Sequence, residues 1–249
     1  MPTGSRKLLA GAAVVATVLA ACGDDGPGTA TTTGGGDAPA DIGVDRADLS
    51  PVIDHPFVAF ASTGGAVFEG EEVDPDTGGA VTLRVESQVR ERPGTVAGVD
   101  VTVVDVSDFE DGELVEQTED YYAQDTAGTV YYLGERVDDY EDGEIVGHHG
   151  GWLAGEDGNR AGEFMPAVLE VGTEFAQEQV PGVAEDRSTV VAVGVSVTVP
   201  AGTFADCIET EDYDPIDDVT EAKFYCRGVG LVREVFPAGG SLDLVELRP

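Results

Sequence analysis

Val106-Ser107-Asp108-Phe109-Glu110-Asp111-Gly112-Glu113-Leu114-Val115 and Val137-Asp138-Asp139-Tyr140-Glu141-Asp142-Gly143-Glu144-Ile145-Val146 are two copies of one pattern. Each copy places Asp-Gly between two runs of strand-forming residues. Asp-Gly in this setting is a strong hairpin signal, because glycine accepts the positive φ that a tight turn requires. The two copies predict successive β-hairpins of an antiparallel meander, since a solenoid would need at least three repeats.

Further strands are indicated by the alternation of apolar and polar residues over 81–89, 99–106, 191–199 and 242–247. Helix signals are scarce: residues 165–179 could hold a short helix, but Pro166 and Gly172 argue against it. We therefore predict an all-β domain over residues 51–249 with at most a short helix. Its expected form is a curved antiparallel sheet of about ten strands, of which an open half-barrel is one version.

The amino terminus has the layout of a signal peptide. Arg6 and Lys7 precede an apolar run from Leu8 to Leu19, which is shorter than the about 20 residues that a transmembrane helix needs. Residues 19–22 then resemble the lipobox of bacterial lipoproteins, in which the cysteine is lipidated and becomes the first mature residue. We predict a signal peptide over 1–21 and an acylated, palmitate-bearing Cys22 on the extracytoplasmic face of the cell membrane. The alternative is an ordinary secretory signal that leaves Cys22 as a free thiol.

Residues 22–50 are predicted to form the lipidated terminus and a flexible linker. From Gly23 to Ser50 the chain is mostly Gly, Ala, Thr, Asp and Pro without an aromatic residue. Such a segment cannot bury enough apolar surface to fold.

The charge of the chain is strongly negative. It has 49 acidic and 13 basic residues, and removal of residues 1–21 takes two basic residues and no acidic one, so that the formal charge changes from −36 to −38. Lys223 is then the only lysine. This balance suggests adaptation to a salt-rich habitat, where counterions screen repulsion. It argues against a nucleic-acid partner, because phosphate binding depends on Lys and Arg.

Cys207 and Cys226 are the only cysteines after Cys22, and both lie in segments that resemble strands. Outside the cytoplasm the natural interpretation is a cross-strand disulfide. A redox-active pair is disfavoured because the Cys-x-x-Cys spacing is missing.

Few residues suggest catalysis or metal binding. The chain has three histidines and no Gly-x-Ser-x-Gly motif. His148 and His149 would point to opposite faces of a strand, so we interpret them as a solvated turn. Residues 138–149 resemble a calcium loop at three positions, but His149 stands where the bidentate Glu is required. We predict no catalytic residue, no metal site and no cofactor.

Aromatic residues are the candidates for a ligand pocket. Either they fill the core, or some of them line an apolar cavity of a few hundred Å³ that would suit a lipid or similar hydrophobic molecule. A chain crossing from Met165 to Gly182 could instead plug the opening. The pocket candidates are Tyr122, Tyr132, Trp152, Phe204 and Phe224.

Four stretches together resemble a group of uncharacterised exported bacterial proteins, many of them predicted lipoproteins. They are Asp120-Tyr121-Tyr122-Ala123-Gln124-Asp125, Thr129-Val130-Tyr131-Tyr132-Leu133-Gly134-Glu135, Val199-Pro200-Ala201-Gly202-Thr203-Phe204 and Tyr225-Cys226-Arg227-Gly228-Val229-Gly230-Leu231-Val232. Where the group has Trp, this chain has Tyr121 and Tyr131, and Cys226 replaces a small residue. The third and fourth stretches also resemble, less specifically, lipoproteins with an open β-barrel of the carrier type. The resemblance implies no catalytic residues.

The favoured function is an exported, membrane-anchored protein that binds a ligand, with an apolar small molecule as the specific candidate. The alternatives are a hydrolase that uses carboxylates and a non-catalytic envelope interaction protein. A catalytic site should gather carboxyl groups of perturbed pKa in a polar cleft, whereas a carrier should show a largely apolar pocket.

Overall fold

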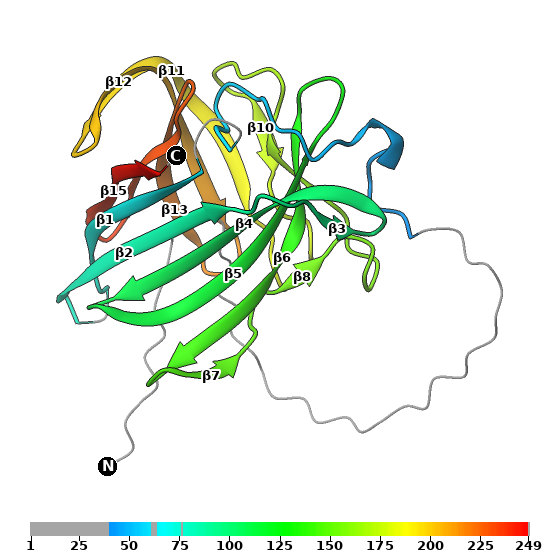
Figure 1. Ribbon diagram of the computed structural model, residues 1–249. Helices are drawn as coiled ribbons and strands as arrows, with labels where there is room; N and C mark the ends of the chain where they lie inside the picture. The colour runs from blue at the N-terminus through cyan, green and yellow to red at the C-terminus, as the bar shows by residue number, and fades with distance from the viewer. Residues whose placement is uncertain (1–39, 61–63, 76, 249) are drawn as a thin grey trace.

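The computed structural model describes residues 40–60, 64–75 and 77–248 (Figure 1). This part of the chain forms fifteen strands of one antiparallel sheet and a three-residue 3-10 helix, which confirms the all-β prediction. The elements are η1 Arg46–Asp48, β1 Gly65–Val73, β2 Ala80–Val89, β3 Gly94–Val96, β4 Val99–Glu110, β5 Glu113–Gln124, β6 Val130–Glu141, β7 Glu144–Gly147, β8 Trp152–Leu153, β9 Gly162–Met165, β10 Glu174–Ala176, β11 Arg187–Val199, β12 Gly202–Asp214, β13 Val219–Cys226, β14 Gly230–Val235 and β15 Gly240–Arg248. The strands beyond the expected ten include β3, β7, β8 and β10, which are too short to show an alternation.

The two Asp-Gly hairpins form as predicted. Asp111 and Gly112 connect β4 to β5 with φ values of 48° and 86°, and Asp142 and Gly143 connect β6 to β7 with 54° and 79°. Positive φ at both central residues is the type I′ combination, whose twist matches that of the flanking strands.

The sheet is strongly curved, but it does not close. Its order is β10-β11-β12-β13-β14-β15-β1-β2-β4-β5-β6-β7, with β8 and β9 paired to β6 and β3 paired to β4. The curvature brings β11, β12 and β13 around to face β4, β5 and β6 (Figure 1). β9 contacts β10, and a Cβ at Gly162 would collide with the backbone carbonyl of Gln177. Glycine at this position therefore allows the two ends of the sheet to approach each other.

A second layer covers the convex side of β4, β5 and β6. Ile42 is completely buried, and its carbonyl accepts a hydrogen bond from the Ala161 amide at 3.0 Å. Ser50 forms an isolated bridge with Gln124 on β5. Residues 40–50, which we assigned to the linker, thus pack against the sheet. Ile42 supplies the apolar surface that the rest of this segment lacks.

The segment 165–179 contains no helix: β9 ends at Met165, and the next element is β10. Across the described ranges, no helix is long and apolar enough to cross a membrane. The predicted signal peptide and Cys22 lie outside the described residues.

The predicted disulfide between Cys207 and Cys226 is confirmed. The two residues lie directly opposite each other on β12 and β13, and both are completely buried. The bond therefore fixes the register of these two strands from inside the sheet.

We expect the double substitution Cys207→Ala with Cys226→Ala to lower the free energy of unfolding by about 3 kcal/mol. The bond joins residues 19 apart in sequence, and opening a loop of that size gives the unfolded chain more conformations. Urea unfolding with and without reductant measures the effect. Reductant should shift the midpoint of the wild type and leave that of the double variant unchanged. An insensitive wild type would contradict the prediction.

Candidate functional site

The concave face of the sheet changes from apolar to acidic along its strands. On β5, Tyr122, Asp120 and Glu116 share this face, because successive side chains point to opposite sides of a strand. On β4, Val104 lies opposite Asp120, and Asp108 lies opposite Glu116. Each strand therefore contributes apolar residues at one end of the interior and carboxyl groups at the other.

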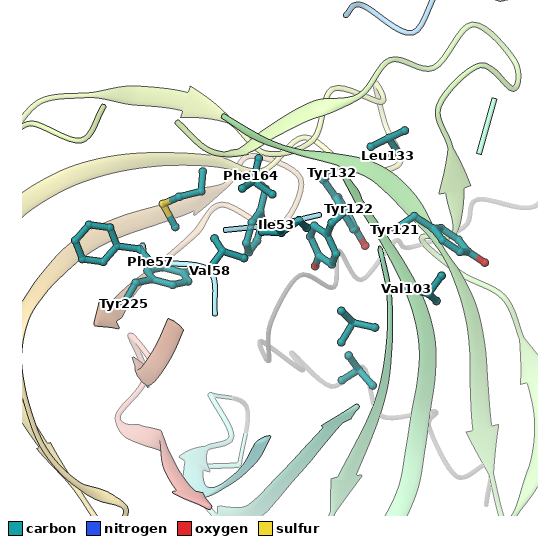
Figure 2. Close-up of a cluster of buried hydrophobic side chains, with 14 of the residues drawn as sticks. Ile53, Phe57, Val58, Val103, Tyr121, Tyr122, Tyr132, Leu133, Phe164 and Tyr225 are labelled. Atoms are coloured by element: carbon teal, nitrogen blue, oxygen red, sulfur yellow. The ribbon is translucent and has the colours of Figure 1, made fainter. Parts of the chain in front are cut away.

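An apolar cavity of about 100 Å³ lies at the apolar end, between the sheet and residues 57–60. Figure 2 shows aromatic side chains from several elements pointing into this interior. The aromatic residues that line the cavity are Phe57, Phe60, Phe68, Tyr122, Phe164 and Tyr225. Asp120 is the one carboxyl group among the described residues that line it. The cavity is smaller than the few hundred Å³ expected from sequence, because Ile53, Phe57 and Val58 occupy much of the concave side.

Only one of the five residues that we predicted to line a pocket lies at the cavity. Tyr122 lines the cavity, and its ring lies 5.0 Å from that of Tyr132, which in turn packs edge-on against Trp152 at 5.6 Å. Tyr132 and Trp152 thus extend the aromatic row away from the cavity. Phe204 and Phe224 are only half-buried at the margin of the core, and Phe224 points away from the interior because its neighbour Tyr225 points into it.

Among the described residues, nine carboxyl side chains are buried, and we call this group the interior acidic cluster. Its members are Glu72, Asp108, Glu110, Glu116, Asp120, Glu135, Glu178, Asp212 and Glu234. They face one another from different elements. Glu135 on β6, for example, is influenced electrostatically by Asp120 on β5 and by Glu178, which follows β10.

Lys223 provides a positive charge within this cluster. The side chain is buried, and its Nζ lies 3.5 Å from carboxyl oxygens of both Asp212 and Glu234 and 4.0 Å from one of Glu221. Burial lowers the pKa of Lys223, but Glu234 and Asp212 more than offset this effect and hold the pKa well above its ordinary value. The only lysine after residues 1–21 is therefore a charged group inside the protein.

Asp120 and its neighbour Glu135 differ in their hydrogen bonds. Asp120 accepts a hydrogen bond of 2.7 Å from the Thr118 hydroxyl and weaker ones of 3.4 Å from the hydroxyls of Tyr122 and Tyr132. Glu135 lies opposite Asp120 in the β5–β6 pairing, and neither of its buried oxygens accepts a hydrogen bond from a described residue. An unpaired buried carboxylate costs free energy, and burial accordingly raises the pKa of Glu135 well above its ordinary value, which favours the protonated form.

Burial also changes the acidity of the cluster. It raises the pKa of Asp120 to about 7, that of Glu178 to about 8 and that of Glu116 to about 9. Trp152 Nε1 donates a hydrogen bond of 2.9 Å to Glu178 and partly offsets the effect there. Carboxyl groups that titrate near neutral pH are characteristic of functional sites.

Sequence reasoning missed these carboxyl groups. With 49 acidic residues in the chain, pairs of carboxyl groups are expected by chance, so the sequence singled out no individual one. A signal was present, because Asp108 follows Val104 and Val106 at intervals of two and Asp120 precedes Tyr122 by two. Acidic residues that continue an apolar face in this way point toward the same side as that face.

Each of the three histidines contacts a partner outside the interior acidic cluster. His148 Nδ1 is 2.8 Å from the Val137 carbonyl oxygen, and His149 Nδ1 is 2.7 Å from Asp139. His55 Nε2 lies 3.2 Å from a backbone carbonyl oxygen at Pro166. Within the described part of the chain, no three His, Cys, Asp or Glu side chains form a group that could hold a metal ion.

The raised pKa values predict that the protein loses stability as the pH rises from about 5 to 8. The folded pKa of Glu116, about 9, lies above the unfolded value of about 4.3. Between these two values the folded state therefore binds more protons than the unfolded state. The stabilisation that Glu116 contributes is fully present below about pH 4, decreases as the pH rises, and is gone above about pH 9. As the pH rises, the free energy of unfolding of the Glu116→Gln variant should therefore fall less steeply than that of the wild type, by about 1.4 kcal/mol per pH unit.

Calorimetric melting temperatures at pH 5, 6, 7 and 8 measure this slope. The matched control is Glu113→Gln at the exposed start of the same strand, which should keep the wild-type slope. Equal slopes for wild type and Glu116→Gln would contradict the assignment.

Five of the residues that carry the resemblance described above lie in this interior. Asp120 and Tyr122 belong to its first stretch, Tyr132 and Glu135 to its second, and Tyr225 to its fourth. All five are buried. In comparisons with known proteins, the chain matches no family model, no curated protein and no solved structure.

Proposed function

We propose that the chain is an exported, membrane-anchored binding protein that takes a small apolar group of its ligand into the cavity on the concave face. The observation that carries this proposal is the cavity itself, because protein interiors are close-packed and leave few voids. Ligand pockets combine an apolar lining with a few polar groups. Here the lining is largely aromatic and aliphatic, and Asp120 is its carboxyl group.

The size of the cavity limits the ligand. About 100 Å³ is less than the roughly 150 Å³ of a cavity that admits benzene. The bound group should therefore be aliphatic and of roughly four carbons, either a whole small molecule or one end of a larger one.

The export and anchoring part of the proposal rests on residues 1–22. The apolar run, the small residues before Cys22 and the lipobox-like sequence support it, and the disulfide between Cys207 and Cys226 suits an oxidising compartment. Acyl chains on Cys22 would hold the domain on the extracytoplasmic face of the membrane.

A hydrolase that uses carboxyl groups is the second candidate. The raised pKa values of Asp120 and Glu116 favour it, because a general acid works best with a pKa near the operating pH. The nine carboxyl side chains are buried in the interior, whereas the paired carboxyl groups of a glycosidase must reach both the sugar and a water molecule. We therefore favour binding over catalysis.

Filling the cavity should abolish ligand binding. Ala66 lines it, and Ala66→Leu adds three carbons where the ligand group would lie. In methyl NMR spectra of the full-length protein, isobutanol at about 1–50 mM should shift the methyl signals of Val85 and Val104, which also line the cavity. Ala66→Leu should lose these shifts.

The control is Ala80→Leu at the exposed first position of β2, which should keep the isobutanol shifts. Wild-type protein without shifts, or shifts that persist in Ala66→Leu, would exclude the cavity as the binding site.

Lipidation is tested at Cys22. In cells supplied with labelled palmitate, the wild-type protein should incorporate label and sediment with membranes, and Cys22→Ser should do neither. One acyl chain binds a membrane only marginally, so stable anchoring requires the additional chains of a lipoprotein terminus. A Cys22→Ser protein that still carries label would overturn the assignment.

A further inference from the structure

One end of the sheet is an open strand edge. In the strand order, β10 and β7 are the two terminal strands. β10 contacts β9, so that its side of the sheet faces another strand. β7 pairs with β6, and no described strand lies along its other edge. β7 therefore keeps backbone donors and acceptors that a further strand could use.

The register of the β6–β7 hairpin shows which backbone groups this edge presents. Glu141 lies opposite Glu144 beside the two-residue turn, and Tyr140 lies opposite Ile145. In a two-residue hairpin the pair beside the turn is hydrogen-bonded, and in an antiparallel ladder the next pair is not. The amide and the carbonyl of Ile145 therefore point away from β6, toward the open edge.

The side chains along this edge are apolar and exposed. Ile145 and Val146 are 51% and 57% exposed, and Figure 1 shows β7 at the outer margin of the sheet. Strand edges are usually protected by charged side chains, above all by lysine. β7 instead presents two β-branched residues, which favour strand pairing. An added strand would remove both side chains from water.

Charge decides which strand can pair with this edge. Residues 137–147 contain no lysine or arginine, and their acidic residues are Asp138, Asp139, Glu141, Asp142 and Glu144. Opposite charges across a strand pair stabilise it, and like charges destabilise it. A second copy of the chain would bring the same acidic residues to the edge, so that repulsion would oppose a dimer. A strand rich in lysine or arginine would be attracted.

We propose that β7 is a docking edge for an extended, basic segment of a partner protein, which joins the sheet as a further strand. The backbone of this segment would bond to Ile145, and its apolar side chains would cover Ile145 and Val146. Its lysine or arginine side chains would meet the acidic hairpin. In strand addition, main-chain hydrogen bonds provide affinity and alternate side chains provide specificity. The inference is independent of the cavity and of the proposed function.

Three end-blocked peptides test this edge: RVRVRVR, EVEVEVE, and RVRVRVR that is N-methylated at every internal residue. EVEVEVE keeps the backbone and reverses the charge, whereas N-methylation keeps the charge and removes the internal donors. In backbone NMR titrations of the full-length protein at about 0.1 M NaCl, RVRVRVR should shift the amide signals of Ile145 and Val146. It should bind about tenfold more tightly than either of the other peptides. Its affinity should fall at about 1 M NaCl, where the screening length shortens from about 10 to about 3 Å.

A substitution in β7 tests the backbone contact directly. Ile145→Pro removes the amide donor that points toward the open edge, and the bonds between β6 and β7 should persist, because proline is tolerated where a strand's N–H faces solvent. Binding of RVRVRVR should weaken about tenfold. The matched control, Ile145→Val, keeps the donor and a β-branched side chain and should bind within about twofold of the wild type. Unchanged amide signals of β4 and β5 verify that both variants are folded.

Several outcomes would overturn the proposal. Equal binding of RVRVRVR and its N-methylated form, or full binding to Ile145→Pro, would show attraction by charge without strand addition. No binding of RVRVRVR, shifts confined to other surfaces, or tighter binding of EVEVEVE would exclude a basic partner at β7. In sedimentation velocity at about 0.1 M NaCl, the protein alone should be a monomer. A dimer that Ile145→Pro dissociates would assign the edge to a second copy instead.

Discussion

The burial of carboxyl groups inside one curved sheet is the constraint on which the rest of this structure depends. In the part of the chain that the structure describes, nine such side chains share the interior with Lys223. Transfer of a charge from water into a protein interior is costly unless the charge is paired or neutralised. The molecule uses both solutions, because Lys223 pairs with Asp212 and Glu234 while Glu116 takes up a proton.

The arrangement of the sheet makes this interior. Strands β4 to β6 and β11 to β13 face each other across it (Figure 1), and the Cys207–Cys226 bond fixes the register on one side. On the other side, the hydrogen bond from Trp152 to Glu178 joins β8 to the chain that follows β10. The sheet thus remains open in its strand order while side chains connect its ends. Residues 53–60 then fill much of the apolar half, which leaves a cavity of about 100 Å³ beside Asp120.

The two kinds of basic side chain have separate places. The described arginine pairs, such as Arg90 with Asp105 and Arg233 with Asp243, lie at the surface and on the margins of the sheet. Such pairs contribute little stability individually, because solvent and salt screen them. Lysine is a compact point charge with three donors, and the one lysine of the domain is buried where several carboxyl groups converge.

The sequence by itself determined the class of the fold and its local signals. Asp111-Gly112 and Asp142-Gly143 specify tight turns because only a few residue types accept their φ values, and Cys207 with Cys226 had no other partner after Cys22. Alternation also determined which residues share a face of a strand, so that Asp120 and Tyr122 could have been placed together. Only the tertiary structure decided that this shared face lies inside the molecule for both of them. Whether a carboxyl group meets water or another carboxyl group depends on the curvature that brings distant strands opposite each other. A local pattern of residues does not determine how close two strands lie that are far apart in sequence.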